Sequence, residues 1–217
     1  GRGGAIRRAL SPIAEALPIS FHGVSLSIGS VDPLDWEFLT QLRDFVREVG
    51  AKWVTDHVSY SSVNGFQFND LLPLQFTREA VRHVVEKVKQ VQDFLGIPFG
   101  LENPSYYKVM PGAEMSEAEF ISEILEMSDC RMLLDVNNVY VNCFNHSDNP
   151  LESARRYLRQ IPLERVIEVH VAGQDKIDSG GQTTISDTHG APVPTDVRAQ
   201  PNNRNKMTPR NTSWRAR

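Results

Sequence analysis

Residues that could bind metal ions recur along this chain of 217 residues, and most of them follow a short apolar run. They lie in the segments "SFHG", "TDHV", "GLEN", "LLDVNN", "EVHV" and "SDTHG". The set consists of His22, His57, Glu102, Asp135, Asn138, His170, Asp187 and His189. Imidazole, carboxylate and amide groups without thiolate suit iron, manganese or zinc. The set is too large for one ion, so it predicts two or three metal ions that share bridging carboxylates.

The pair Asp187-x-His189 fits both a metal site and an ordinary turn. In extended chain, a spacing of two residues places both side chains on the same side. Asp, Thr, Gly and Pro are also the residues of ordinary turns, so "DTHGAPVP" read alone favours a turn. Beside the other candidate ligands, the same pair favours a metal site.

Each candidate ligand also has a structural interpretation. A histidine on a strand is often a hydrogen-bonded core residue, and Asp135 and Asn138 could simply organise their own loop. Three nearby acids are expected to be structural or to support the ligands from behind, namely Asp56, Glu168 and Asp175. His83 is expected to face solvent from the middle of a helix, and His146 to lie in a turn.

Five units that repeat one order would position these residues: a helical pattern, a short turn, and an apolar strand that ends in polar residues. Helices are expected near residues 5–17, 34–49, 78–95, 117–128 and 150–160. Strands are expected within residues 19–28, 51–60, 97–103, 130–141 and 165–173. Thr77 and Ser116 are expected N-caps, the latter with Glu119 in a capping box, and Gly96 is an expected stop. Residues 61–76 are expected to form a long loop.

Strands that alternate with helices predict an α/β fold with a parallel sheet. No glycine-rich phosphate loop follows a strand, which removes the commonest mark of an open nucleotide-binding sheet. Polar residues at the carboxyl ends of the strands instead favour a TIM-type (β/α) barrel, in which those ends meet at one rim. Five clear strands are fewer than the eight of a closed barrel, so the barrel is expected to be incomplete.

Composition narrows the function classes. Forty per cent hydrophobic and 23% charged residues are ordinary for a globular protein, and two cysteines favour a reducing cytoplasm. No apolar run or signal pattern predicts a membrane segment. The net charge of −4 gives no reason to expect nucleic acid. The last twenty residues, 198–217, carry five Arg and one Lys without acids, so they predict a disordered basic tail behind a domain of residues 1–197.

A known family shares several of these blocks in the same order. The segments "HGVSLSIGS", "DHVSYSSVNG", "NDLLPLQFT", "LENPSYY", "LLDVNNVYVN", "EVHVAG" and "DTHGAPVP" resemble the multinuclear iron-dependent oxidases. That family long carried only a domain-of-unknown-function label, and it includes the iron oxidase subunit of methanobactin biosynthesis. The resemblance runs from about residue 19 to residue 197.

The resemblance implies a TIM-type barrel with two or three iron ions at its carboxyl-terminal rim. It implies a substrate as well: cysteine residues of a ribosomally made precursor peptide, modified with dioxygen, often with a small partner protein that presents the peptide. Matched motif by motif, His22 and His57 would bind one iron, and Glu102 would bridge to a second iron. Asp135 and His170 would bind the second iron, which makes Glu102 and Asp135 the candidate catalytic residues. The third iron or the rest of the rim would take Asn138, Asp187 and His189.

The chain departs from the family pattern at both ends. Family members have one more strand before the first helix, and they continue after "DTHGAPV" with a helix and a strand that carries a glutamate in an "EWD"-like block. Neither piece has a counterpart here, so the chain is expected to be truncated. Two alternatives therefore stay open: a two-metal hydrolase or isomerase on a xylose-isomerase-like barrel, and an inactive truncated remnant. Outside its tail the chain carries a net −10, which argues against a nuclease.

Overall fold

The computed structural model describes residues 10, 12–188 and 190–194. Residues 10 and 12–16 are helical, in agreement with part of the first expected helix. The expected basic tail, the domain boundary at residue 197 and the candidate ligand His189 lie outside the described residues.

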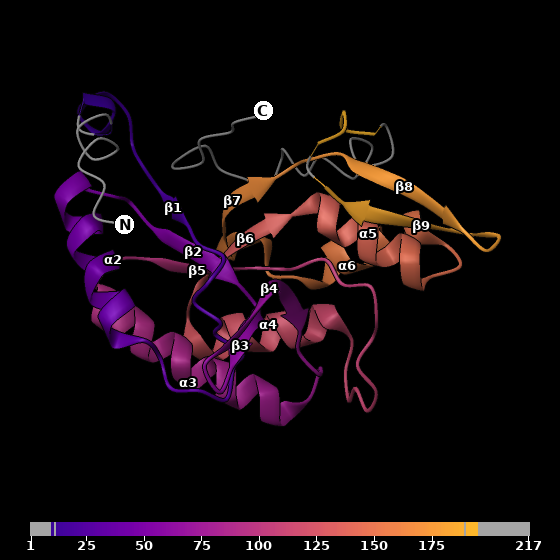
Figure 1. The fold of residues 1–217 in the computed structure, drawn as a ribbon, viewed down its shortest axis with the longest axis horizontal. Helices are drawn as coiled ribbons and strands as arrows, with labels where there is room; N and C mark the ends of the chain where they lie inside the picture. Colours follow the sequence, from indigo (N-terminus) through magenta and orange to yellow (C-terminus); the bar gives the residue numbers. More distant parts are fainter. Residues whose placement is uncertain (1–9, 11, 189, 195–217) are drawn as a thin grey trace.

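A curled sheet of five parallel strands forms the centre of the molecule (Figure 1). The strands are β1 (Phe21–His22), β2 (Val54–His57), β5 (Phe99–Glu102), β6 (Arg131–Asp135) and β7 (Val166–His170). Their spatial order is β1-β2-β5-β6-β7, which is also their order along the chain. Consecutive parallel neighbours joined through helices are the arrangement of a (β/α) barrel. The predicted α/β fold is confirmed, and the sheet forms half of such a barrel.

Helices link the strands and bury the outer face of the sheet. They are α2 (Trp36–Val49), α3 (Arg78–Leu95), α4 (Glu117–Ser128), α5 (Val136–His146) and α6 (Pro150–Gln160). Val84 and Val88 of α3 are fully buried in the same apolar core as Leu101 and Met132 of the sheet. In the described part of the chain, no helix is long and apolar enough to cross a membrane.

Local sequence signals set the ends of α3 and α4. The side chain of Thr77 accepts a hydrogen bond from the backbone of Ala80, and Gly96 ends α3 in the left-handed conformation with φ 68°. Ser116 and Glu119 form a reciprocal capping box at the start of α4. These caps satisfy backbone groups that the first and last helical turns leave unpaired. The predicted caps and stop are confirmed.

The expected loop at residues 61–76 is wrong. Most of this segment belongs to an antiparallel hairpin of β3 (Ser59–Val63) and β4 (Phe66–Pro73). Asn64 and Gly65 turn the hairpin with φ of 52° and 74°. An Asn-Gly pair favours a turn of this kind because both residues tolerate positive φ. The hairpin signal was therefore present in the sequence.

The expected strand at residues 130–141 is too long. The strand β6 ends at Asp135, and the helix α5 begins at the next residue. The Asp135 side chain accepts a hydrogen bond from the backbone of Asn138, 2.8 Å away, and so caps the helix. Valine-rich sequence favours a strand by propensity, but the cap and the burial of Val139 and Val141 favour the helix here.

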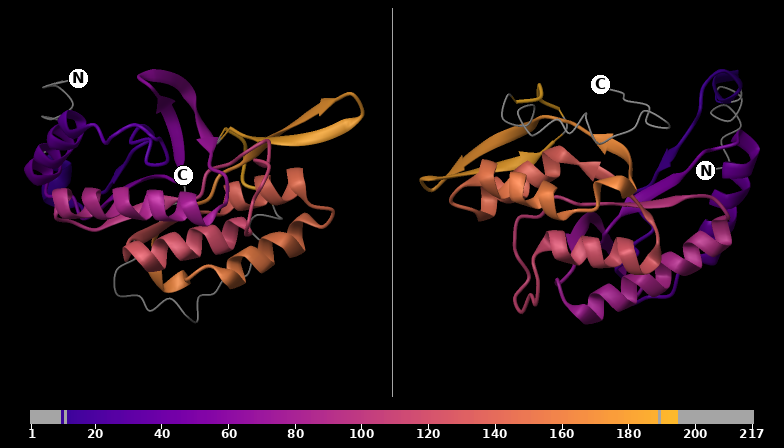
Figure 2. Two further views of the ribbon diagram at one scale, coloured as in Figure 1. Left: turned by 90° about the horizontal axis from the view of Figure 1, so that it is seen from below. Right: turned by 180° about the vertical axis from the view of Figure 1, so that it is seen from behind.

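A second hairpin, of β8 (Gln174–Ser179) and β9 (Gln182–Asp187), follows the last parallel strand. Gly180 and Gly181 turn it with φ of 60° and 82°. Figure 2 (left) shows both hairpins projecting from the sheet, on the side away from α4 and α6. Asp187 therefore ends an antiparallel strand and not a further strand of the parallel sheet.

A buried acid ties the loop between β5 and α4 to the helix α5. The Tyr106 hydroxyl donates to Glu117 Oε2 over 3.1 Å, and Asn142 Nδ2 donates to the same oxygen over 3.4 Å. Asn142 Oδ1 also accepts from the Tyr106 backbone over 2.8 Å. Burial raises the pKa of Glu117 to about 7, against partial compensation from these hydrogen bonds.

This raised pKa predicts a loss of stability as pH rises. Between pH 4.5 and pH 7 the folded chain holds a proton on Glu117 that the unfolded chain has released, so the free energy of unfolding falls with pH. The loss is on the order of 3 kcal/mol. Denaturant unfolding at pH 5 and pH 8 should show that the free energy of unfolding of Glu117→Gln does not fall in this way. Glu126→Gln, exposed on the same helix, is the control and should lose as much stability as the unsubstituted chain does. Equal losses in Glu117→Gln and the unsubstituted chain would contradict the assignment.

Candidate metal centre

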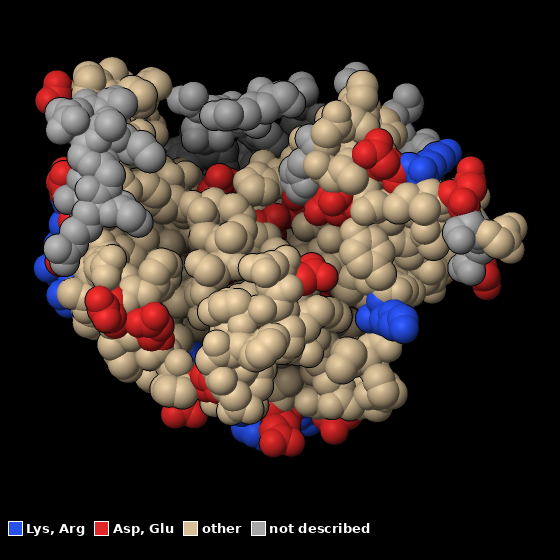
Figure 3. Space-filling model, viewed as in Figure 1, with Lys and Arg blue, Asp and Glu red and all other residues tan. Residues whose placement is uncertain are grey.

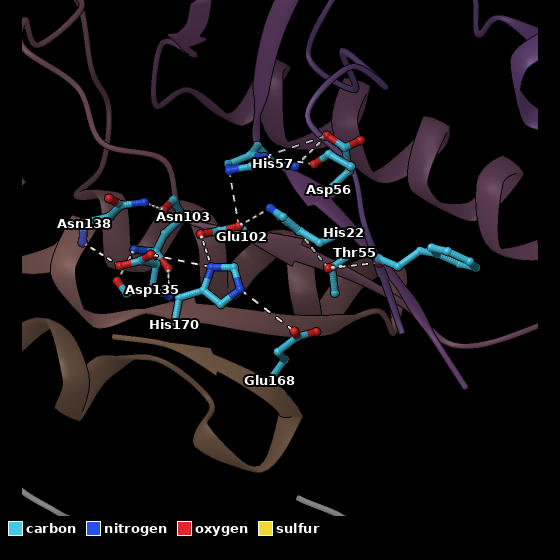
Figure 4. Close-up of polar contacts among 12 residues, drawn as sticks. His22, Thr55, Asp56, His57, Glu102, Asn103, Asp135, Asn138, Glu168 and His170 are labelled. Carbon is cyan, nitrogen blue, oxygen red and sulfur yellow. Dashed lines mark hydrogen bonds and ion pairs between the residues drawn. The ribbon is translucent and has the colours of Figure 1, made fainter. Parts of the chain in front are cut away.

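Each of the five parallel strands ends in one of the candidate ligands. The last residues of β1, β2, β5, β6 and β7 are His22, His57, Glu102, Asp135 and His170. His57 pairs with Glu102 across two strands, and Asp135 pairs with His170 across two others. Because parallel strands place their carboxyl ends at one edge, the five side chains meet there (Figure 4).

Glu102 lies at the centre of this group and is almost fully buried. Its Oε2 atom is 3.0 Å from Nε2 of His22 and 3.2 Å from Nε2 of His57. Its Oε1 atom is 3.3 Å from Nδ1 of His170. The two oxygens of one carboxylate thus face two different sets of imidazoles, which is the geometry of a bridging ligand.

Asp135 completes the second set. Its Oδ2 atom lies 3.7 Å from Nδ1 of His170, on a side chain that is fully buried. Among the described residues, two groups have ligand atoms close enough to share one ion: His22 with His57 and Glu102, and Glu102 with Asp135 and His170. Glu102 belongs to both groups, so the arrangement offers two adjacent metal positions.

The hydrogen-bond partners of Nδ1 in His22 and His57 indicate which ring nitrogen carries the proton. Nδ1 of His57 lies 3.2 Å from the carbonyl oxygen of Gly23, which can only accept. Nδ1 of His22 lies 2.9 Å from the Thr55 hydroxyl oxygen, whose own proton goes to a backbone carbonyl. Both rings therefore hold a proton on Nδ1 and direct the Nε2 lone pair toward Glu102.

A lone pair that faces a carboxylate oxygen is repelled unless a cation lies between them. Within the described part of the chain, Glu102 Oε2 is buried and accepts no hydrogen bond, although two ring nitrogens lie within 3.2 Å. Burial lowers the pKa of His57, which disfavours a second proton on that ring. A metal ion satisfies both nitrogens and the oxygen at once, so the residues fit a cation of this class.

The close packing of these ligands also shifts the pKa values of Glu102 and His170. Burial opposes ionisation of Glu102, but His170, His22 and His57, when their rings are protonated, outweigh it and lower the pKa of the carboxyl. Burial likewise opposes a charge on His170, but Glu102, Asp135 and Glu168 raise the pKa of its ring. A metal ion must displace any proton from His170, so metal affinity should fall as pH falls.

Asn103 supports this edge of the sheet, although it is not among the residues that sequence analysis selected. Its side chain is fully buried and makes two hydrogen bonds with the backbone of Asp135, one donated over 2.9 Å and one accepted over 3.0 Å. Asn138 in turn donates from Nδ2 to the Asn103 carbonyl oxygen over 3.1 Å. Its place directly after Glu102 in "LEN" was the available signal.

The last two candidate ligands along the structure lie apart from the central group. Asn138 Oδ1 is buried without a hydrogen-bond partner among the described residues, one helical turn beyond Asp135. Asp187 lines a cleft above the central group. Its Oδ1 atom accepts a hydrogen bond from Asn137 Nδ2 over 2.8 Å, and it belongs to neither of the two groups of three ligands. The partner expected for Asp187, His189, lies outside the described residues.

Three other residues are placed by their hydrogen bonds. Asp56 accepts from the backbone of Leu26 over 3.1 Å and holds the loop after β1, while burial raises its pKa to about 6. His83 was expected to face solvent, which is wrong: it is half-buried and bonds the carbonyl oxygen of Ser30 over 2.7 Å. His146 was expected in a turn, but it is the last residue of α5.

A cleft of about 780 Å³ opens above the candidate ligands. One wall is the inner half of β4, with Leu71 and Leu72, and another is the loop after β5, with Tyr107 and Met110. The charged residues of the lining, apart from candidate ligands, are Asp70 and Lys108. Figure 3 shows few lysine or arginine side chains on this face around β3 and β4. The cleft therefore offers an apolar approach to a polar floor.

Known proteins resemble this chain in fold and in sequence. A xylose isomerase domain-containing protein of Salmonella typhimurium superposes with a TM-score of 0.52 at 15% identity, over 84% of this chain and 62% of that one. At this identity the likeness shows the fold alone. The UPF0276 protein of Acaryochloris marina is 42% identical over 184 residues, and that of Shewanella loihica is 44% identical over 191.

These two relatives are longer than the chain. The matches cover 85% and 88% of this chain but 64% and 66% of the relatives, so the chain spans just under two thirds of their length. The family described as "RiPP precursor modification enzyme MbnB/TglH/ChrH" matches residues 1–205. The chain therefore belongs to the MbnB/TglH/ChrH family of RiPP precursor modification enzymes.

Proposed function

We propose that this chain is the metal-binding part of an iron-dependent oxidase that modifies cysteine residues of a ribosomally made precursor peptide. One observation carries the proposal: three histidines and two buried carboxylates converge beneath a cleft, in a chain of the RiPP precursor modification family. The pairs His22 with His57 and Asp135 with His170 would each hold one iron. Glu102 would bridge them, with Asn138, Asp187 and His189 as candidates for a third position.

The residues of the chain contribute binding, orientation and shape. Bound iron would supply the one-electron chemistry with dioxygen that no amino-acid side chain provides. Glu102 and Asp135 would supply negative charge that offsets the charge of the ions. Thr55 and Gly23 keep the rings of His22 and His57 aimed inward through their Nδ1 protons.

The cleft suits a peptide better than a sugar. Its walls are mainly apolar, from Leu71 and Leu72 on one side to Tyr107 and Met110 on the other. A sugar would need many polar partners in the walls, whereas a peptide segment with apolar side chains would bury them there. The xylose-isomerase-like fold is shared by many activities and does not favour the isomerase alternative. A small presenting protein, implied by the family, stays a prediction.

The direct test uses oxygen uptake and peptide mass. The iron-loaded chain is mixed with a pool of synthetic peptides that each contain one cysteine, and a matched pool carries serine instead. We expect oxygen consumption and a change of peptide mass with the cysteine pool alone. Equal uptake with both pools, or peptide conversion without dioxygen, would contradict the proposal.

The walls of the cleft predict where peptide affinity comes from. Leu71→Ala and Met110→Ala, on opposite walls, should each raise KM about 10-fold, because each removes apolar surface that the peptide buries. The value of kcat should stay unchanged, since this binding is the same in the ground state and the transition state. Ile177→Ala, exposed on β8 outside the cleft, is the control and should change neither value. A fall in kcat without a change in KM would contradict this role.

A further inference from the structure

The three histidines of the centre each have a second nitrogen that faces outward. For His22 and His57 this nitrogen is Nδ1, which meets the neutral oxygens of Thr55 and Gly23. Asp56 Oδ1 also lies 4.0 Å from Nδ1 of His57. His170 is turned the other way, because its Nδ1 faces Glu102 and its Nε2 faces outward. To bind a metal through Nδ1, the neutral ring must carry its proton on Nε2. A group near Nε2 therefore decides whether His170 can act as a ligand.

That group is Glu168, two residues earlier on β7. Residues two apart on a strand lie on the same side of the sheet. Glu168 Oε1 lies 3.9 Å from Nε2 of His170, as Figure 4 shows, and the Glu168 side chain is about one quarter exposed. Unlike the Thr55 hydroxyl behind His22, Glu168 presents an anion to the outer nitrogen.

Glu168 is itself held in place from across the sheet. Trp53 Nε1 donates a hydrogen bond to Glu168 Oε2 over 2.8 Å. Trp53 directly precedes β2, and β5 and β6 separate β2 from β7 in the sheet. The contact thus bridges the concave side of the curled sheet and leaves Oε1 of the same carboxylate directed at the ring of His170.

We propose that Glu168, held by Trp53, is the positioning residue that fixes the Nε2 proton and the ring orientation of His170. Once a metal ion offsets the charges of Glu102 and Asp135, the carboxylate of Glu168 favours the proton on the outer nitrogen and leaves the Nδ1 lone pair to bind the metal. The inference rests on the proposed metal centre and adds a partner behind its second position. An anionic partner makes His170 a stronger donor than a ring such as His22, which meets a neutral hydroxyl.

The first test reads the ring proton of His170 in the zinc-loaded chain, because zinc is diamagnetic and accepts the same nitrogen and oxygen donors. Side-chain nitrogen NMR reports the Nε2 resonance and its attached proton for each histidine. We expect the Nε2–H signal of His170 to be present and shifted downfield in the unsubstituted chain, and to move upfield or exchange faster with water in Glu168→Gln. The signals of His22 and His57 should not change. An unchanged His170 signal in Glu168→Gln would overturn the proposal.

The second test reads metal affinity at the two positions. In titrations with ferrous iron under anaerobic conditions, we expect Glu168→Gln to bind one of the two iron ions 10- to 100-fold more weakly than the unsubstituted chain does. Its affinity for the other iron ion should change less than about 3-fold. Trp53→Phe, which keeps the ring and removes the donor, should act in the same direction and serves if Glu168→Gln does not fold. Glu164→Gln, exposed just before β7, is the control. Equal loss at both positions would overturn the proposal.

The two tests separate this proposal from the proposed function. If the unsubstituted chain binds zinc but no iron, the proposed function fails, while the NMR measurement on the zinc-loaded chain still decides the role of Glu168. If the chain binds iron and Glu168→Gln changes neither the His170 signal nor either affinity, the positioning role fails alone.

Discussion

Replacement of Glu102 by Gln should abolish occupation of both metal positions. The carboxylate places one oxygen near His22 and His57 and the other near His170, so a single substitution weakens both groups of ligands. An amide has one oxygen and no charge, and it cannot offset two cations. We expect metal affinity to fall by at least about 100-fold, because even partners behind the ligands are worth 10- to 100-fold.

Elemental analysis and iron titration measure this effect, and folding must be checked beside it. Glu102 is buried among imidazoles, and breaking a buried ion pair costs about 3–5 kcal/mol. Circular dichroism therefore accompanies the titration. Glu102→Asp keeps the charge but shortens the bridge, so it should fold and bind one ion in place of two. Glu86→Gln, exposed on α3, should bind as the unsubstituted chain does. Full metal content in folded Glu102→Gln would contradict the bridging role.

Replacement of Asp135 should separate its two roles, since its two oxygens do different things. Oδ1 accepts from the backbone of Asn138 and caps α5, while Oδ2 faces the ring of His170. Asparagine caps helices about as well as aspartate. Asp135→Asn should therefore keep the cap and lose the ligand, with little change in metal-free stability and a fall of at least about 100-fold in affinity at the second position.

Asp135→Ala is the companion variant, because it removes both roles. It should lose the same metal affinity and a further 1 kcal/mol or so of metal-free stability, since the cap is lost as well. Denaturant unfolding without metal and iron titration measure the two effects separately. If Asp135→Asn and Asp135→Ala lose equal stability, the cap assignment fails; if Asp135→Asn keeps both ions, the ligand assignment fails.

The sequence was sufficient to predict the parallel strands and the polar residues that meet at one edge, although the expected strands ran past those residues. An apolar run that stops at a polar residue, as before Glu102 or Asp135, marks the end of a buried strand, and parallel strands align those ends. The two hairpins were missed for different reasons. Asn64–Gly65 carried a turn signal that was not used, whereas the polar β8–β9 sequence has little apolar alternation.

The finer arrangement of the site could not be predicted from residue types. Sequence cannot say which nitrogen of His170 faces inward, because that depends on the curl of the sheet and on Glu168. Trp53 and Glu168 are 115 residues apart and share no local pattern. Asp135 is both a helix cap and a candidate ligand, and strand propensity in the sequence after it concealed the first role.

The number of metal ions that each chain holds is the decisive measurement for a two-metal centre. The chain is purified anaerobically without chelator, and iron, manganese and zinc are counted per chain by elemental analysis. We expect two or more iron ions per folded chain, with Glu102→Gln nearly free of metal. A folded chain that binds no iron when iron is supplied, or that takes up zinc or manganese in its place, would contradict the proposed iron centre.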